Sequence, residues 1–124
     1  MNLLPFFKSV LDEDKSPIVI CDLKHTIIYM NSSACQRYKR QGGEELMGKR
    51  LLNCHNPKSR EMIEKVIAWF GESYDNNRIY TYRNDDENKD VYMIALRDES
   101  GELIGYYEKH EYRNRETEPL YNFK

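Results

Sequence analysis

The chain is poor in cysteine, lacks any long hydrophobic run and shows no concentration of charge of one sign. Its three cysteines, Cys21, Cys35 and Cys54, are an odd number without a C-x-x-C spacing. The sequence therefore predicts free thiols rather than a disulfide framework or a zinc knuckle. The longest apolar stretch is only a few residues, far below the roughly 20 that a membrane helix needs, and the N-terminus has no secretory signal. We expect a cytoplasmic protein with no membrane contact.

The charge pattern also argues against a nucleic-acid partner. The formal net charge is −2, acidic and basic residues are interspersed, and the densest basic run, RYKRQ at 37–41, is short. A nucleic-acid-binding protein usually carries a basic stripe. With 124 residues, of which 40% are hydrophobic and 32% charged, the chain fits one globular domain with a well solvated surface.

Tyrosine is the most over-represented aromatic residue. There are ten tyrosines against four phenylalanines and one tryptophan. A tyrosine buries apolar area but keeps a hydroxyl group that needs a partner. This composition indicates a partly polar interior or an interface.

Periodicity divides the chain into helices and strands. Helical spacing occurs at 3–11 and 57–70, with shorter helical turns between 31 and 55. Runs typical of strands occur at 18–23, 26–30, 78–83, 90–98 and 102–113, separated by turn residues. The order predicts an α+β fold, in which one five-stranded antiparallel sheet carries short helices on one face.

The N-terminal segment LLPFFKSVL predicts an amphipathic helix with no partner nearby in sequence. Its apolar face is made of Leu3, Leu4, Phe6, Phe7, Val10 and Leu11. We expect this face to pack on a sheet or on a second subunit, and favour a homodimer.

Three segments resemble the PAS family of sensor domains. They are PIVICDLKHTIIYMNSSACQRY, which contains a D-x-x-x-x-I-x-Y-x-N pattern, EELMGKRLLNCHNPKS, and ALRDESGELIGYYE. The likeness covers roughly residues 16–112 and is greatest to PAS modules found with hemerythrin-like domains in anaerobic bacteria. It implies a PAS fold, with an N-terminal helix at 1–15, the PAS domain at 16–113 and a polar tail at 114–124.

The resemblance also implies a ligand cup between the sheet and the helices. Its register places Tyr106, Glu108 and His110 on the cup side of the last strand. A carboxylate and an imidazole facing inward are costly unless they meet a ligand or each other. In the preceding strand, we expect alternation to turn Tyr92, Ile94 and Leu96 inward and Met93, Ala95 and Arg97 outward. The full set of predicted ligand-binding residues is Tyr29, Tyr38, Cys54, His55, Tyr80, Tyr92, Ile94, Tyr106, Glu108 and His110.

Adjacent Cys54 and His55 leave several readings open. If the cup holds haem, the iron ligand is His55 or His110. Against this, the helix that carries the histidine in common haem-binding PAS modules reads REMIEKVIAWF here and has none. Flavin is not expected, because NSSACQRY departs from the cysteine motif of light-sensing PAS domains. A metal site and a Cys–His catalytic pair gain no support from spacing. The remaining interpretation is that Cys54 and His55 lie at the junction between two helices and have no binding role.

The sequence therefore predicts a sensory module and not an enzyme. We expect it to bind a small molecule in the cup and to signal through a dimer interface to a partner protein. A haem sensor and a ligand-free dimerisation module remain the alternatives.

Overall fold

The computed structural model describes residues 1–124 except for the side chain of Cys54, which lies outside the described part. Five antiparallel strands form one sheet in the order β2-β1-β5-β4-β3. The strands are β1 (Val19–Asp22), β2 (Ile27–Met30), β3 (Arg78–Asn84), β4 (Lys89–Arg97) and β5 (Leu103–Tyr112). The helices are α1 (Leu4–Glu13), α2 (Ser32–Arg37) and α3 (Pro57–Glu72), with short 3-10 turns η1 (Lys39–Gln41), η2 (Gly43–Leu46) and η3 (Leu51–Cys54). The predicted α+β architecture is confirmed.

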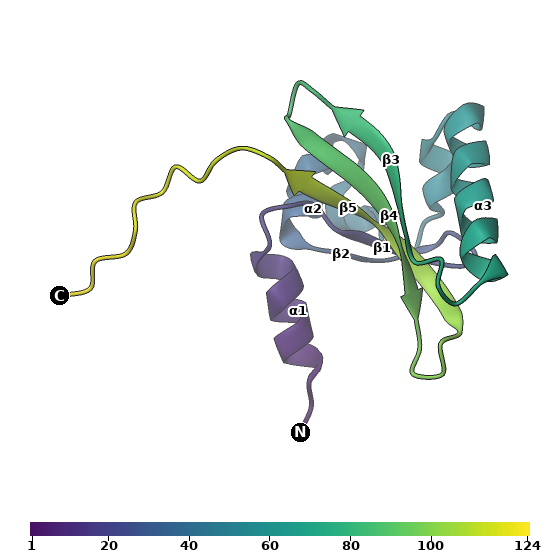
Figure 1. The fold of residues 1–124 in the computed structure, drawn as a ribbon, viewed down its shortest axis with the longest axis horizontal. Coiled ribbons are helices and arrows are strands. Elements are labelled where there is room, and N and C mark those ends of the chain that lie inside the picture. The colour runs from purple at the N-terminus through teal and green to yellow at the C-terminus, as the bar shows by residue number, and fades with distance from the viewer.

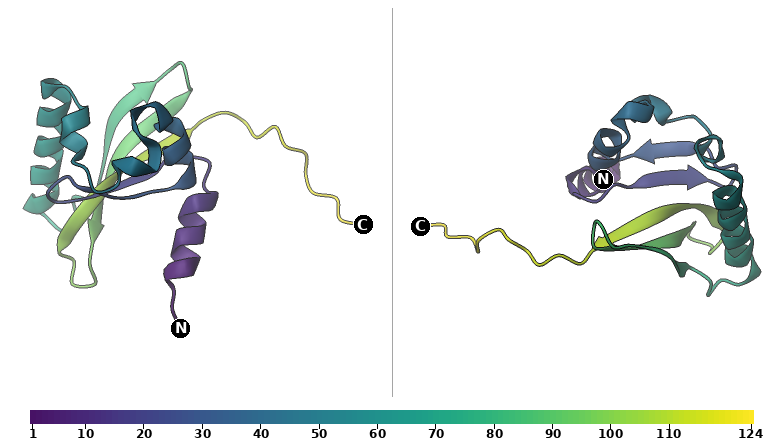
Figure 2. Two further views of the ribbon diagram at one scale, coloured as in Figure 1. Left: turned by 180° about the vertical axis from the view of Figure 1, so that it is seen from behind. Right: turned by 90° about the horizontal axis from the view of Figure 1, so that it is seen from above.

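The sheet is curved, and α2, the 3-10 turns and α3 all cover the same face (Figures 1 and 2). The strand at its centre, β5, pairs with both β1 and β4. Gly105 permits the first of these pairings, since a Cβ atom there would lie 2.2 Å from the carbonyl oxygen of Cys21. The beginning and end of the domain are thus joined at the middle of the sheet.

The longest helix on this face, α3, begins with residue types that favour a helix start. Asn56 caps α3 by accepting a hydrogen bond from the Ser59 amide at 2.8 Å, and Pro57 follows at the first helical position. Buried Ile63, Val66 and Phe70 form the apolar stripe of α3. They pack in the core with side chains from the sheet, and this packing holds α3 over one end of the cup.

Asn31, which precedes α2, ties several segments together. It is fully buried, and its Oδ1 accepts hydrogen bonds from the Ala34 and Ile18 amides, each at 2.9 Å. Its Nδ2 donates to the carbonyl oxygens of Leu11 at 2.7 Å and Ser16 at 2.9 Å. One side chain therefore fixes the start of α2 to β1 and to the end of α1.

The register predicted for β4 was wrong. Met93 is only 2% exposed and pairs with Glu108, whereas Tyr92 and Ile94 pair with Lys109 and Tyr107 on the opposite face. Every residue from 91 to 96 is apolar or aromatic, so alternation along β4 gives no polar marker of its outward face. The neighbouring strand decides the register.

Two parts of the chain extend from the body of the domain. Helix α1 has no buried residue, and Leu4, Phe6, Phe7 and Val10 are 58–71% exposed. Figure 1 shows α1 projecting on one side and the tail after β5 leading away on another. Across residues 1–124, no described helix is both long enough and apolar enough to cross a membrane.

Candidate functional site: a cavity between sheet and helices

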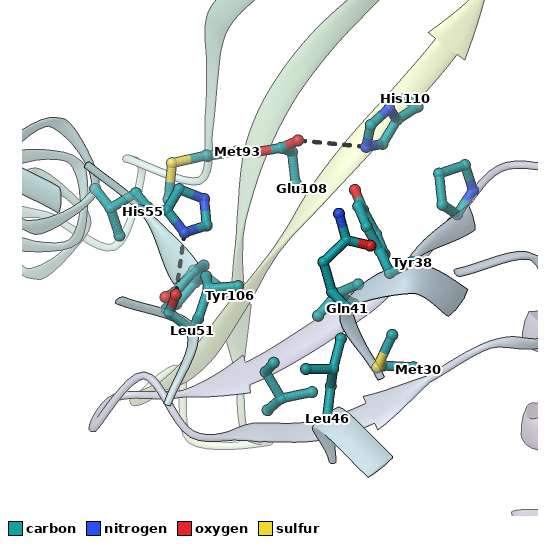
Figure 3. A pocket seen from close by; sticks show the side chains of 14 residues that line it. Met30, Tyr38, Gln41, Leu46, Leu51, His55, Met93, Tyr106, Glu108 and His110 are labelled. Atoms are coloured by element: carbon teal, nitrogen blue, oxygen red, sulfur yellow. Dashed lines mark hydrogen bonds and ion pairs between the residues drawn. The ribbon is translucent and has the colours of Figure 1, made fainter. Parts of the chain in front are cut away.

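A cavity of about 250 Å³ lies between the sheet and the helices that cover it (Figure 3). Its walls combine aliphatic side chains with a smaller number of polar ones. The lining residues are Pro17, Val19, Ile27, Met30, Tyr38, Gln41, Leu46, Leu51, His55, Ile63, Met93, Tyr106, Glu108 and His110. An apolar hollow with a few polar groups is the usual form of a small-molecule site.

Strand β5 supplies one polar wall. Tyr106, Glu108 and His110 alternate with Tyr107 and Lys109, so all three lie on the face that the helices cover. The end of α2 and the turn η1 supply the opposite wall with Tyr38 and Gln41. In Figure 3 the Tyr38 hydroxyl and the Gln41 amide point toward the end of the cavity where Glu108 and His110 meet.

Glu108 and His110 form the polar contact at that end. The Nε2 atom of His110 lies 3.3 Å from a carboxylate oxygen of Glu108. His110 is 8% exposed, whereas the Glu108 side chain is 48% exposed. The buried Nδ1 of His110 has no hydrogen-bond partner among the described residues. An ionised carboxylate only accepts, so a proton on Nε2 suits this contact, whereas a proton on Nδ1 would meet no acceptor in the described part of the chain.

His55 occupies the end of η3. Its Nδ1 donates a hydrogen bond to the carbonyl oxygen of Leu51 at 3.0 Å, which leaves Nε2 as an acceptor. The carbonyl of His55 in turn accepts from Arg60 Nε at 3.0 Å, which fastens the junction to α3. His55 thus lies at the junction between two helices and also lines the cavity.

Tyr106 connects the cavity to the turn between β1 and β2. Its hydroxyl lies 2.8 Å from His25 Nδ1, and the two rings meet edge to face. Burial, followed by the neighbouring Cys21, raises the Tyr106 pKa far above its ordinary value. Burial also raises the pKa of the Cys21 thiol to about 11. Both groups stay protonated at neutral pH and act here as packing and hydrogen-bonding groups.

The structure brings together only some of the residues predicted for the site. Tyr38, His55, Tyr106, Glu108 and His110 line the cavity. Cys54 was predicted alongside them, but its side chain lies outside the described part of the structure.

Four predicted residues lie elsewhere, which corrects their assignment to the ligand-binding set. Tyr29 donates to Asp12 at 2.6 Å and so joins β2 to α1. Tyr80 and Tyr92 stack with their ring centres 5.2 Å apart on the outer face of the sheet, where Ile94 also lies. Tyr80 and Tyr92 are thus turned away from the helices.

Sequence reasoning missed most of the aliphatic lining and one polar residue. Gln41 ends the short turn η1 just before two glycines, and no apolar periodicity there reveals the direction of its side chain. Met93 was excluded by the wrong register of β4. Of the aliphatic residues, Ile63 alone had a clear signal, because it belongs to the predicted apolar stripe of α3.

No group of three or more metal-ligating side chains occurs among the described residues. A zinc site made of Cys54, His55, Glu108 and His110 would include the Cys54 side chain, which lies outside the described part of the structure. The cavity itself is smaller than the roughly 300–1,000 Å³ typical of sites for drug-sized ligands. Its size suits a compact organic molecule.

Similar structures come from several bacteria. The PAS domain of a protein from Colwellia psychrerythraea has a TM-score of 0.64 and 17% identity, with 89% of this chain and 96% of that one covered. The C-terminal domain of a Streptococcus mutans protein has a TM-score of 0.63 and 22% identity, with 85% and 81% covered. The PAS domain of BvgS from Bordetella pertussis has a TM-score of 0.53 and 18% identity, with 92% and 88% covered. At these identities the likeness establishes the fold.

The comparison of sequences points the same way. No curated protein matches the chain. The family model described as "PAS domain" matches residues 15–108, which include the whole sheet up to Glu108 and every helix that covers it. The chain belongs to the PAS domain family.

Proposed function

We propose that this PAS domain is a sensory module that binds a small organic molecule in the cavity between β5 and the covering helices. The observation that carries the proposal is the buried His110 at the cavity wall, whose Nδ1 has no partner among the described residues and whose Nε2 lies 3.3 Å from a half-exposed carboxylate. A buried polar group with unused bonding capacity costs stability, and such groups are typical of binding sites. The apolar lining supplies the remaining attraction for a ligand.

The signal is proposed to leave the cavity through α2. Tyr38 forms the C-terminal cap of this helix and lines the cavity, whereas Asn31 caps its N-terminus and is bonded to the Leu11 carbonyl of α1. A ligand that favours one position of Tyr38 shifts α2, and Asn31 passes the shift to α1. A ligand has this effect only by binding two arrangements with different affinity.

Ligand occupancy is tested by blocking the cavity. Leu51 lines it, and Leu51→Phe fills part of the space, whereas Ile28→Phe adds a comparable volume at a side chain that is 56% exposed. We expect a fragment library, screened by saturation-transfer NMR, to contain compounds that bind the wild type and Ile28→Phe but not Leu51→Phe. If no fragment distinguishes the two variants, the cavity is not a ligand site.

The second part of the proposal is a homodimer formed through α1. The apolar face predicted from the sequence is uncovered, with Phe6 59% and Phe7 58% exposed. A face of this kind marks an interaction site. Light scattering after gel filtration should give a dimer mass for the wild type and for Ser9→Glu, and a monomer mass for Phe7→Glu. A wild-type monomer, or loss of the dimer in both variants, would contradict the α1 interface.

Haem is the alternative that one observation favours. The bond from His55 Nδ1 to the Leu51 carbonyl fixes the ring with Nε2 free, as in many metal-bound histidines. The cavity volume opposes this alternative, because haem is larger than the drug-sized ligands that already need more space. A Soret band that titrates with one equivalent of haemin and is lost in His55→Ala would identify haem, and not a small organic molecule, as the ligand.

The setting of the module is also part of the proposal. Cys21 and Cys35 are free thiols, which suits the reducing cytosol. We propose that a signalling protein receives the output of α1, and that the likeness to modules found with hemerythrin-like domains indicates one such setting. A pull-down with the wild type and Phe7→Glu would identify any partner that depends on α1.

A further inference from the structure

We infer that the ligand of this cavity is a small organic cation, with a protonated amine at the Glu108 end and an apolar body toward Leu46 and Ile63. The inference rests on the proposed function and deepens it by naming the class of ligand. The charge and the hydrogen-bonding groups of the cavity wall favour a ligand of this class.

Glu108 is the one formally charged residue in the lining as the structure describes it, where neither lysine nor arginine occurs. The nearby basic groups are already paired. Arg37, which precedes Tyr38, donates to both carboxylate oxygens of Glu87 at 2.8 and 3.0 Å. Lys89 lies 3.2 Å from the same carboxylate. The polar end of the cavity therefore has a negative charge without a fixed counter-ion.

His110 does not supply that counter-ion. A protonated ring would carry a second N–H at Nδ1, which is buried and has no acceptor among the described residues. A buried donor without an acceptor is costly, so a proton at Nδ1 is disfavoured. The effect of the carboxylate is felt across the cavity, since the negative charge of Glu108 contributes, after burial, to the raised pKa of Tyr38.

The neutral groups around the cavity also favour a donor. His55 Nε2 is an acceptor because Nδ1 is committed to Leu51, and the Gln41 carbonyl and the Tyr38 hydroxyl can both accept. An ammonium group offers three donors and no acceptor, which complements this set.

Two other classes of ligand fit less well. A carboxylate or a phosphate would approach Glu108 with no cation to balance the two like charges. A divalent metal needs several ligating side chains together, and no group of three occurs in the described part of the chain. An organic amine satisfies one carboxylate without these requirements.

Size sets the probes for the test. A cavity of about 250 Å³, compared with about 30 Å³ per water molecule in the liquid, holds on the order of ten non-hydrogen atoms. We would therefore titrate 2-phenylethylamine, 2-phenylethanol and phenylacetate into the protein at neutral pH by isothermal calorimetry. The three probes share one apolar body and carry a positive, a neutral and a negative end.

We expect the amine to bind at least ten-fold more tightly than the alcohol, and phenylacetate to bind more weakly still. Glu108→Gln keeps the shape of the side chain and removes its charge, so it should cost the amine at least ten-fold and leave the alcohol unchanged. Glu111→Gln is the matched control, because this carboxylate lies on the same strand but is bonded to Arg78 and Lys109 on the outer face. It should leave all three affinities unchanged.

Several results would overturn the inference. They are equal or tighter binding of the alcohol or phenylacetate, full amine affinity in Glu108→Gln, and no binding of any probe. The fragment screen with Leu51→Phe separates this failure from a failure of the proposed function. If some fragments bind the wild type but not Leu51→Phe, the cavity is a ligand site with a different chemical preference. If no fragment does so, both proposals are wrong.

Discussion

Asn31 and His110 are both buried polar residues, yet their surroundings differ in one respect. Asn31 is 0% exposed, and its amide group uses both its oxygen and its nitrogen in hydrogen bonds to four backbone groups within 3.0 Å. His110 is 8% exposed; within the described part of the chain one of its nitrogens has no partner, and the other lies 3.3 Å from a half-exposed carboxylate. The first cluster is saturated and the second is not.

This difference distinguishes two kinds of buried polar residue in one small domain: those that hold the fold together and those that are available to a ligand. A saturated cluster holds segments together, and its loss leaves buried groups without partners. An unsaturated cluster contributes little to the fold but has bonding capacity left for a ligand. Substitutions should therefore affect stability strongly at the first and weakly at the second.

The largest effect is expected for Asn31→Ala. The change removes the cap of α2 and leaves the Ile18 amide and the Leu11 and Ser16 carbonyls without this partner. We expect the free energy of unfolding to fall by about 4 kcal/mol, measured by urea denaturation. Asn56→Ala is the matched control, since Asn56 caps α3 in the same way but is exposed, and it should cost about 1 kcal/mol. Equal costs would mean that the buried bonds of Asn31 contribute nothing beyond the cap.

The next effect concerns a second cluster of paired polar groups, in which Glu87 holds both Arg37 of α2 and the buried Lys89 of β4. Glu87→Gln leaves Lys89, whose side chain is 3% exposed, without its counter-ion. We expect a loss of about 3 kcal/mol in the free energy of unfolding. Asp85→Asn in the same turn is the control, because the Asp85 side chain is 88% exposed, and it should change stability very little. A small loss in Glu87→Gln would show that Lys89 does not depend on this carboxylate.

The same cluster predicts a pH dependence. The hydrogen bond from Arg37 is the main cause that lowers the Glu87 pKa from 4.5 to about 2. Because the folded-state pKa is the lower one, the contribution of Glu87 is present in full above the unfolded-state value and is lost as pH falls from 4.5 toward 2. The stability difference between the wild type and Glu87→Gln should therefore narrow across this window in urea titrations. A constant difference would contradict the shift.

The sequence predicts the saturated cluster at Asn31 only in part. The residue types and the helical spacing that follows make Asn31 or Ser32 the expected cap, and in the structure the cap is Asn31. Its bonds to Leu11 and Ser16 depend on where α1 and β1 come to lie, which no local pattern contains. Local chemistry fixes the start of the helix, whereas tertiary packing decides how much else the side chain holds.

The sequence likewise predicts only some of the residues that line the cavity. The register implied by the PAS resemblance places Tyr106, Glu108 and His110 on the cup side, where the structure has them. The alternation of β4 led instead to Tyr92 and Ile94, because both faces of that strand carry apolar or aromatic residues. Period alone predicts a face only where polar and apolar residues differ between the two sides.

The smallest effect on stability, and the sharpest test of the comparison, is expected for His110→Leu. The change removes a buried group with an unused nitrogen and replaces it with an apolar side chain of similar size, while Glu108, at 48% side-chain exposure, still meets water. The free energy of unfolding should change by no more than about 1 kcal/mol in either direction, measured by urea denaturation in the absence of ligand. A loss above about 2 kcal/mol would mean that His110 is a structural residue like Asn31, because only a satisfied buried group costs so much to replace by an apolar one. Since the substitution removes the imidazole that lies 3.3 Å from the Glu108 carboxylate, it should also leave the carboxylate more available to the amine probe. If the free energy of unfolding stays constant while the affinity for the amine changes, His110 is a ligand-binding residue and not a structural one.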